Sequence, residues 1–333
     1  MTHSVSIGFD GRVMELAFVK KIEEELKTIP GITININPTL DLVGKIWTDR
    51  PKLLFNEIYI LPIEFSGKEA ADKLNEVRLA LREKQADYHL ISSLDDIAWL
   101  LNLRGSDIAS NPVFLSFLFI SEDSAVLFCH IESISDEIRD YLEELGISLG
   151  NYDDIYDFLR SYKEKDGSGE NGENKETVPL ILLDPDTINY RLYSEACKSF
   201  APLLEENPSG LMKSMKNETE IENLRAANIT DGIAMVRFLK WIDDYRKYSD
   251  FEDITEMMVV KKLLEFRRLS PDFIDTSFET IAAYGSHGAI VHYEPTAETD
   301  ITIDREGFLL VDSGAQYLKG TTDITRTIVM GEL

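Results

Sequence analysis

Two aspartates near the C-terminal end are the side chains of this sequence best suited to bind a metal. Asp312 ends the apolar stretch at residues 307–311, and Asp323 follows residues 318–320, whose types predict a hairpin turn. Cross-strand neighbours on a hairpin have Cβ atoms roughly 4.5–8 Å apart. Two carboxylates at that separation repel one another unless positive charge lies between them. The pair therefore predicts a site for two divalent ions about 3.5–4 Å apart, and oxygen ligands favour Mn²⁺ or Mg²⁺.

The alternative interpretation is structural, because two carboxylates on a hairpin most often bind nothing. The surroundings favour a site. A charge that ends an apolar run is costly to leave unpaired, and Thr322, Thr325 and Arg326 could order the carboxylate of Asp323. The pair is only half of a dinuclear centre, since such centres usually include a histidine and further carboxylates.

His292 is the second candidate. It belongs to residues 289–293, which predict a strand that ends before the turn at Pro295. An imidazole there could donate to a substrate carbonyl or stabilise a developing charge, although a strand-end histidine without any task is equally compatible with the pattern. His287 lies in a Gly-Ser-His-Gly turn and is predicted to be a solvated loop residue.

The segments around these residues predict long helices followed by strands. Asn217 and Glu220 have the spacing of a capping box and begin a long helix, and residues 253–256 repeat that signal before a helix to about residue 268. The remaining pattern predicts the strands 277–283, 289–293, 308–317 and 321–330.

The upstream sequence alternates strands and helices, which predicts an α/β layer architecture. Residues 4–36 read as a βαβ-like fragment, and residues 93–101 as a helix that Ser93 caps. Residues 163–177 contain no apolar side chain and predict a disordered insertion. The other predicted strands are 88–91, 113–120, 124–130 and 180–183, and the other predicted helices are 68–85, 136–145 and 152–162.

Composition excludes several classes of protein. The chain of 333 residues is 44% hydrophobic and 28% charged, which is typical of a globular protein of two or three domains. Its 60 acidic and 34 basic residues give a net charge of -26, which disfavours nucleic acid and anionic membranes as partners. No apolar run is long enough for a membrane span, and the N-terminus does not resemble a signal peptide. Cys129 and Cys197 are expected to be buried free thiols, so a cytoplasmic protein is predicted.

Three stretches of the sequence resemble the aminopeptidase P (Xaa-Pro aminopeptidase) family of metallopeptidases, in its long three-domain form. They agree with the family in order and spacing along essentially the whole chain. They are residues 45–51 (KIWTDRP), residues 93–107 with 111–114, and residues 288–295 (GAIVHYEP) followed by 311–317 (VDSGAQY) and 320–327 (GTTDITRT).

The resemblance implies a fold class of α/β and α+β, with creatinase-like N-terminal α/β domains followed by an incomplete pita-bread catalytic domain. It divides the chain into the C-terminal part of the first creatinase-like domain at 1–57, the second at 58–205, and the N-terminal part of the catalytic domain at 206–333.

The resemblance also implies a function, the hydrolytic release of an N-terminal residue that precedes proline. In that family two Mn²⁺ ions hold the attacking hydroxide. Asp312 matches the aspartate that binds one ion, Asp323 the aspartate that bridges both, and His292 the histidine that assists substrate binding and the transition state. A proline-containing peptide substrate and a full-length cytoplasmic homodimer are also implied.

The sequence departs from the family in two ways. The remaining metal ligands of the family, one His and two Glu, are expected beyond Leu333, so the chain is expected to be an internal fragment that is inactive alone. The family usually has Asn at the position of His287. Two alternatives remain at this point: a naturally truncated, non-catalytic binding or dimerisation protein, and a dipeptidase or creatinase-type hydrolase with the same fold.

Overall fold

The computed structural model describes residues 3–162, 178–248 and 253–331, so the predicted disordered insertion at 163–177 lies outside the described residues. The chain forms two compact units. One contains Met1–Ile60, Lys68–Asp107 and Val113–Met215, and the other contains Leu61–Gly67, Ile108–Pro112 and Lys216–Leu333.

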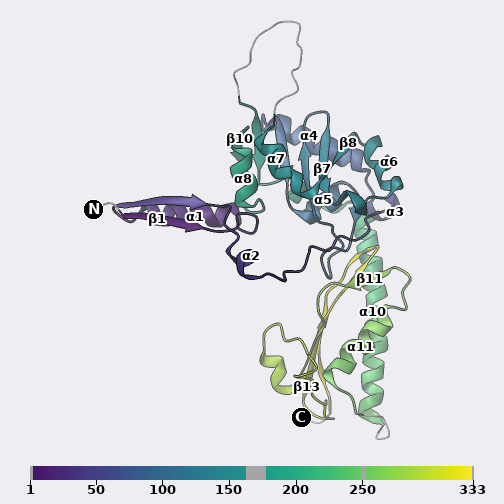
Figure 1. The fold of residues 1–333 in the computed structure, drawn as a ribbon. Coiled ribbons are helices and arrows are strands. Elements are labelled where there is room, and N and C mark those ends of the chain that lie inside the picture. The colour runs from purple at the N-terminus through teal and green to yellow at the C-terminus, as the bar shows by residue number, and fades with distance from the viewer. Residues whose placement is uncertain (1–2, 163–177, 249–252, 332–333) are drawn as a thin grey trace. The chain divides into compact units, whose positions relative to one another are not determined.

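The first unit begins with the predicted βαβ fragment. Strand β1 (His3–Gly8) pairs in parallel with β2 (Ile32–Asn37), and helix α1 (Leu16–Lys27) connects them (Figure 1). Leu16 and Val19 are buried on this helix. A short helix α2 (Leu42–Ile46) follows.

A mixed six-stranded sheet forms the centre of the first unit. Apolar side chains from both of its faces enter separate hydrophobic clusters: Leu118 and Leu127 belong to one cluster, and Phe117 and Phe128 to the other. Burial on both faces explains why these strands read as continuous apolar runs. In spatial order the strands are β10 (Ala201–Leu204), β9 (Leu180–Leu183), β4 (Tyr88–Ile91), β6 (Ser116–Ile120), β7 (Ala125–Cys129) and β8 (Ile147–Asn151).

Helices pack against this sheet from both sides, as the predicted layer architecture requires. Val77 on α4 contributes to one cluster, and Leu159 on α7 with Leu192 on α8 to the other. The pattern did not predict α8, α9 or β10. Ser93 is the N-cap of α5 as predicted, but its side chain makes no capping hydrogen bond. The helices are α4 (Ala70–Glu83), α5 (Leu94–Leu100), α6 (Asp136–Glu144), α7 (Ile155–Arg160), α8 (Tyr190–Ala196) and α9 (Pro208–Ser214), with the small pair β3 (Tyr59–Ile60) and β5 (Leu103–Arg104) beside them.

The second unit contains α3 (Ile63–Ser66) and two longer helices. Helix α10 (Glu218–Lys247) begins at the predicted capping box, in which the backbone N–H of Glu220 donates to Asn217 Oδ1 and the N–H of Asn217 donates to Glu220 Oε2, both over 2.9 Å. Helix α11 (Glu256–Arg267) is capped by Thr255, so the start signal lies two residues later than the predicted Asp253.

Two antiparallel three-stranded sheets complete the second unit. One has the order β11 (Phe273–Thr276), β14 (Ala315–Tyr317) and β15 (Gly320–Thr321), and the other β12 (Ile281–Tyr284), β13 (Phe308–Ser313) and β16 (Ile324–Val329). The predicted hairpin therefore exists, but its two long strands are each divided between the sheets. The division falls at Gly314, where a Cβ would lie 2.1 Å from Thr322 O, so only glycine fits.

The predicted strand at residues 289–293 is wrong. Residues Gly285–Ala289 form a 3₁₀ turn, η3, and His292 has a φ of 56°. Gly285 also has positive φ, which turns the chain away from the sheet directly after β12. The prediction for Cys197 was also wrong: Cys129 is buried, but Cys197 is exposed, and both are free thiols.

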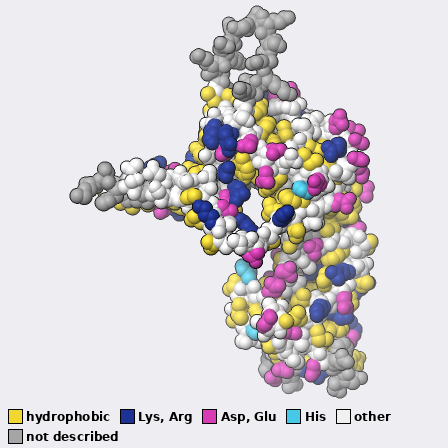
Figure 2. All heavy atoms as spheres, in the orientation of Figure 1, with side chains coloured by type: hydrophobic (Ala, Val, Ile, Leu, Met, Phe, Trp, Pro, Cys, Tyr) yellow, Lys and Arg dark blue, Asp and Glu magenta, His cyan; other side chains and the backbone are white. Residues whose placement is uncertain are grey.

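The surface charge and the hydropathy of the helices can be compared with the sequence analysis. Acidic side chains occur on both units on the face shown in Figure 2. Within the part of the chain that the structure describes, no helix is both long and apolar enough to cross a membrane.

Candidate active site

Strand β13 presents alternate residues to opposite faces of its sheet. Leu309 and Val311 are fully buried in the core of the second unit, together with Phe238 of α10 and Leu263 of α11. Because side chains alternate along a strand, Asp312 lies on the other face. We call the face that carries Asp312 the aspartate face, and the face that carries Val311 the core face.

The structure brings Asp323 to Asp312. Asp312 is opposite Thr325 of β16, and Asp323 comes directly before that strand, two residues from Thr325 and therefore on the same face. Partial desolvation raises the pKa of Asp323 above its ordinary value, and the neighbouring Asp312 carboxyl raises it further. A second carboxyl group this close to Asp323 makes the aspartate face a place where positive charge is stabilising.

A hydrogen bond orders one of the two carboxylates. Thr325 Oγ1 donates to Asp312 Oδ1 over 2.7 Å. The threonine therefore orders Asp312 rather than Asp323, the residue for which the sequence had suggested this role. The second oxygen of Asp312 and the Asp323 carboxyl supply the hard oxygen donors that Mn²⁺ or Mg²⁺ prefers. These donors fit part of a divalent metal site, although no group of three or more His, Cys, Asp and Glu side chains gathers within the described residues.

His292 lies in the turn that follows η3, and its side chain is exposed. No hydrogen bond or ion pair among residues 253–331 connects it with Asp312 or Asp323. Its positive φ is uncommon for a residue other than glycine and costs roughly 1–2 kcal/mol. Such strain persists only where neighbouring contacts fix the backbone.

Glu256 supplies those contacts. This first residue of α11 is fully buried, and its carboxylate accepts hydrogen bonds from the Tyr284 backbone N–H over 2.6 Å and from the Tyr293 hydroxyl over 2.7 Å. His287 Nδ1 lies 3.0 Å from both carboxylate oxygens, and its ring packs against Tyr293 with centroids 4.4 Å apart. The contacts of Glu256 thus hold both ends of the turn that carries His292.

Sequence reasoning missed this arrangement. It read Glu256 only as part of a helix start, and it predicted His287 to be a solvated loop residue, which is wrong. One signal was available in the sequence. Thr255 already caps α11, so the carboxylate of the next residue, Glu256, is free to bind another part of the chain. Its partners lie 28–37 residues further along the chain, so no local pattern shows them.

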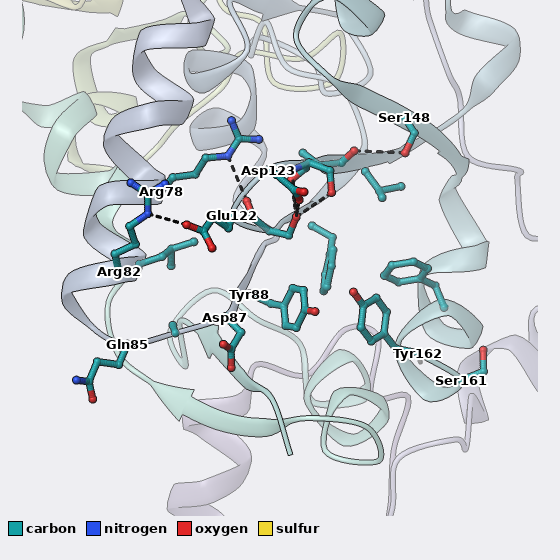
Figure 3. Close-up of a pocket in the computed structure, with 18 residues that line it drawn as sticks. Arg78, Arg82, Gln85, Asp87, Tyr88, Glu122, Asp123, Ser148, Ser161 and Tyr162 are labelled. Atoms are coloured by element: carbon teal, nitrogen blue, oxygen red, sulfur yellow. Dashed lines mark hydrogen bonds and ion pairs between the residues drawn. The ribbon is translucent and has the colours of Figure 1, made fainter. Parts of the chain in front are cut away.

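A cavity of about 1510 Å³ lies in the first unit, away from these residues in the sequence. Figure 3 shows Arg78, Arg82, Glu122 and Asp123 on one side of it, with Arg82 Nε 3.2 Å from Glu122 Oε1. None of its lining residues is a histidine or a cysteine. The cavity therefore lacks the predicted site residues, and the aspartate face remains the candidate active site.

Comparison with known proteins identifies the family to which each region of the chain is similar. Residues 49–220 match the family model of the creatinase/prolidase N-terminal domain, and residues 222–333 match metallopeptidase family M24. The chain therefore belongs to the creatinase/prolidase family. Asp312, Asp323, His292 and the Glu256 network all lie in the M24 region.

Similar proteins confirm the resemblance to aminopeptidase P. The chain is 37% identical to Xaa-Pro aminopeptidase 1 of Dictyostelium discoideum over 98% of this chain and 51% of that protein. It is 34% identical to a probable Xaa-Pro aminopeptidase P of Chaetomium globosum, again over 98% of this chain and 51% of that protein. The chain thus spans about half the length of the curated relatives it matches.

A solved structure confirms the fold class. The X-prolyl aminopeptidase of Caenorhabditis elegans, described as a cytosolic enzyme with a di-nuclear active site, superposes with a TM-score of 0.88 at 29% identity, over 99% of this chain and 52% of that chain. The chain thus combines a creatinase-like N-terminal region with an M24 pita-bread region, as the resemblance implied.

Proposed function

We propose that this chain is part of a metal-dependent Xaa-Pro aminopeptidase, which releases an N-terminal residue that precedes proline. The observation that carries the proposal is the pairing of Asp312 with Asp323 on the aspartate face of the M24 region, where partial desolvation and the nearby Asp312 carboxyl raise the pKa of Asp323. The names of the similar proteins support the substrate class. We assign residues 1–57 and 58–205 to two creatinase-like domains and residues 206–333 to part of the catalytic domain.

The residues of this chain have distinct tasks in the proposed reaction. Asp312 and Asp323 hold the metal ions, and Thr325 orients Asp312 through its 2.7 Å hydrogen bond. When bound, divalent ions lower the pKa of water and polarise the scissile carbonyl. His292 donates a hydrogen bond to the substrate as charge develops, and Glu256 fixes the turn from which it does so.

Three finer assignments accompany the proposal. The resident ions are two Mn²⁺, because the donors are oxygens and the relatives' chemistry is hydrolytic. The natural protein is a cytosolic homodimer. Metal analysis by mass spectrometry, light scattering on the purified protein and cell fractionation test these assignments one by one.

Single substitutions in the natural full-length protein test the function. Asp312→Ala and Asp323→Ala should each remove bound Mn²⁺ and cleavage of a tripeptide whose second residue is proline. The loss should exceed the roughly 10–100-fold typical for a residue that merely supports a metal ligand. Asp304→Ala is the matched control, since Asp304 is an exposed carboxylate of the same unit. Near-normal turnover by either aspartate variant would overturn the metal assignment.

A further inference from the structure

A fully buried ion pair lies beneath the candidate active site, on the core face of the sheet. Arg267 of α11 is 1% exposed and Asp231 of α10 is 0% exposed. Arg267 Nε donates to Asp231 Oδ1 over 2.7 Å, and Arg267 Nη2 donates to Asp231 Oδ2 over 3.1 Å. The proposed reaction gives neither residue a task, and no local pattern in the sequence connects two residues on different helices.

Two of the side chains that hydrogen-bond to the pair each lie next to one of the paired aspartates. Arg267 Nη2 donates to Ser313 Oγ over 3.1 Å, and Ser313 directly follows Asp312. Asp231 Oδ2 accepts from Thr322 Oγ1 over 2.7 Å, and Thr322 directly precedes Asp323. Both Ser313 and Thr322 are buried.

Stability alone does not account for this arrangement. Moving two charges out of water costs several kcal/mol each, and well-packed apolar side chains often stabilise a core as well as a buried ion pair does. Apolar packing is not directional, so it would not fix the positions of particular backbone segments as hydrogen bonds do. A two-pronged arginine–carboxylate pair fixes the positions of its atoms, and its hydrogen bonds to Ser313 and Thr322 fix the backbone beside each aspartate.

We infer that the Asp231–Arg267 pair is the positioning element that sets the separation of Asp312 and Asp323. Consecutive residues of an extended chain point to opposite faces, so holding Ser313 on the core face sets the backbone from which Asp312 projects on the other face. Thr322 does the same for Asp323. The inference rests on the proposed function, because it assigns these residues to the metal site of that function.

Two mild substitutions in the natural full-length protein test it without removing the buried charges. Ser313→Ala removes only the arginine contact beside Asp312. Thr322→Val removes the carboxylate contact beside Asp323, together with the bond that Thr322 Oγ1 accepts from the Ala315 N–H. Calorimetric titration with Mn²⁺ should show affinity on the order of 10-fold weaker for each variant. Thr322→Ser, which keeps the hydroxyl, should restore it.

Tyr317→Phe is the matched control. The Tyr317 hydroxyl donates to the same Asp231 carboxylate over 3.0 Å, but Tyr317 is on β14 and adjoins neither aspartate. It should lower the thermal unfolding midpoint about as much as Ser313→Ala and leave Mn²⁺ affinity unchanged. Equal Mn²⁺ affinity in wild type, Ser313→Ala and Thr322→Val would overturn the inference, as would an equal loss in Tyr317→Phe.

The aspartate variants separate the two proposals. If Asp312→Ala and Asp323→Ala abolish Mn²⁺ binding while Ser313→Ala and Thr322→Val bind as wild type does, the positioning inference fails and the proposed function stands. If the wild type binds no Mn²⁺, or the aspartate variants bind it normally, both fail. Should Thr322→Val not fold, Ser313→Ala decides the matter alone.

Discussion

Thr325 Oγ1 donates a hydrogen bond to Asp312 Oδ1 across the β13–β16 ladder, over 2.7 Å. The bond occupies one carboxylate oxygen and leaves the other on the aspartate face. A ligand carboxylate that is held by such a partner loses less rotational freedom when a metal binds, and outer partners of this kind contribute measurably to metal affinity.

The first prediction concerns this bond. Thr325→Val should weaken Mn²⁺ binding on the order of 10-fold, whereas the free energy of unfolding should change by only about 0.5 kcal/mol because Thr325 is exposed. Thr327→Val is the control, since Thr327 lies on the same strand and face but opposite Leu310. Titration calorimetry and urea unfolding provide the two measurements. Equal affinities for both variants would contradict the prediction.

The second prediction concerns Glu256. Glu256→Gln replaces one carboxylate oxygen, an acceptor, by an NH₂ group, a donor. One of the buried groups that donate to Glu256 then has no acceptor, which should lower the free energy of unfolding by about 1–3 kcal/mol. The turn at residues 285–293 should then exchange its amide hydrogens faster, and peptide turnover should fall through His292. Glu265→Gln, an exposed change on the same helix, should do neither. Unaltered hydrogen exchange in the turn would show that Glu256 does not hold it.

The third prediction compares two glycines. Gly314→Ala places a methyl group 2.1 Å from both Ser277 Oγ and Thr322 O, and one of these atoms is backbone that cannot move aside. The change should cost about 3 kcal/mol. Gly232→Ala in α10 meets no atom within 4 Å and should stabilise by about 0.4–1 kcal/mol. Thermal unfolding of the two variants should therefore shift in opposite directions, and shifts of the same sign would argue against so close an approach of the two strands at Gly314.

The fourth prediction concerns pH. Glu195 accepts hydrogen bonds from Arg160 over 2.7 Å and 3.0 Å and from Lys198 over 2.6 Å, and the arginine contact is the main cause that lowers the pKa of Glu195 to about 2. Because the folded-state pKa lies below the ordinary value of 4.5, this interaction stabilises the fold above about pH 4.5 and is lost as the pH falls towards 2.

Glu195→Gln should accordingly be less stable than wild type at pH 7, and the two proteins should converge near pH 2. Urea midpoints recorded across that range make the comparison. If the urea midpoints of wild type and Glu195→Gln differed by the same amount at every pH, the charge of Glu195 would not contribute to stability.

Sequence patterns predicted the elements whose signals are local. The strands 88–91 and 180–183 have the predicted bounds because each is a short, mostly apolar run between polar or turn residues. Asn217 with Glu220 marks the start of α10 through contacts three residues apart. The proximity of Asp312 and Asp323 also followed from local order, since one hairpin joins them.

The supporting contacts could not be predicted in this way. The apolar residues 289–291 suggested a strand, but the hydrogen bonds of Glu256 to the flanking residues hold this segment in a turn. Asp231 and Arg267 read as ordinary charged helix positions, and only the packing of α10 against α11 brings them together. Tertiary contacts of this kind override local propensity.

The alternation along β13 has a consequence for protein engineering. Residues of the aspartate face and residues of the core face occupy successive positions on β13, so a mutational library can vary one set and keep the other. Randomising Ile281, Leu310 and Thr327 on the aspartate face while retaining Val311 and Ser313 should give a large fraction of folded clones. Such a library could be screened for cleavage of other peptides without first adding mutations that restore stability.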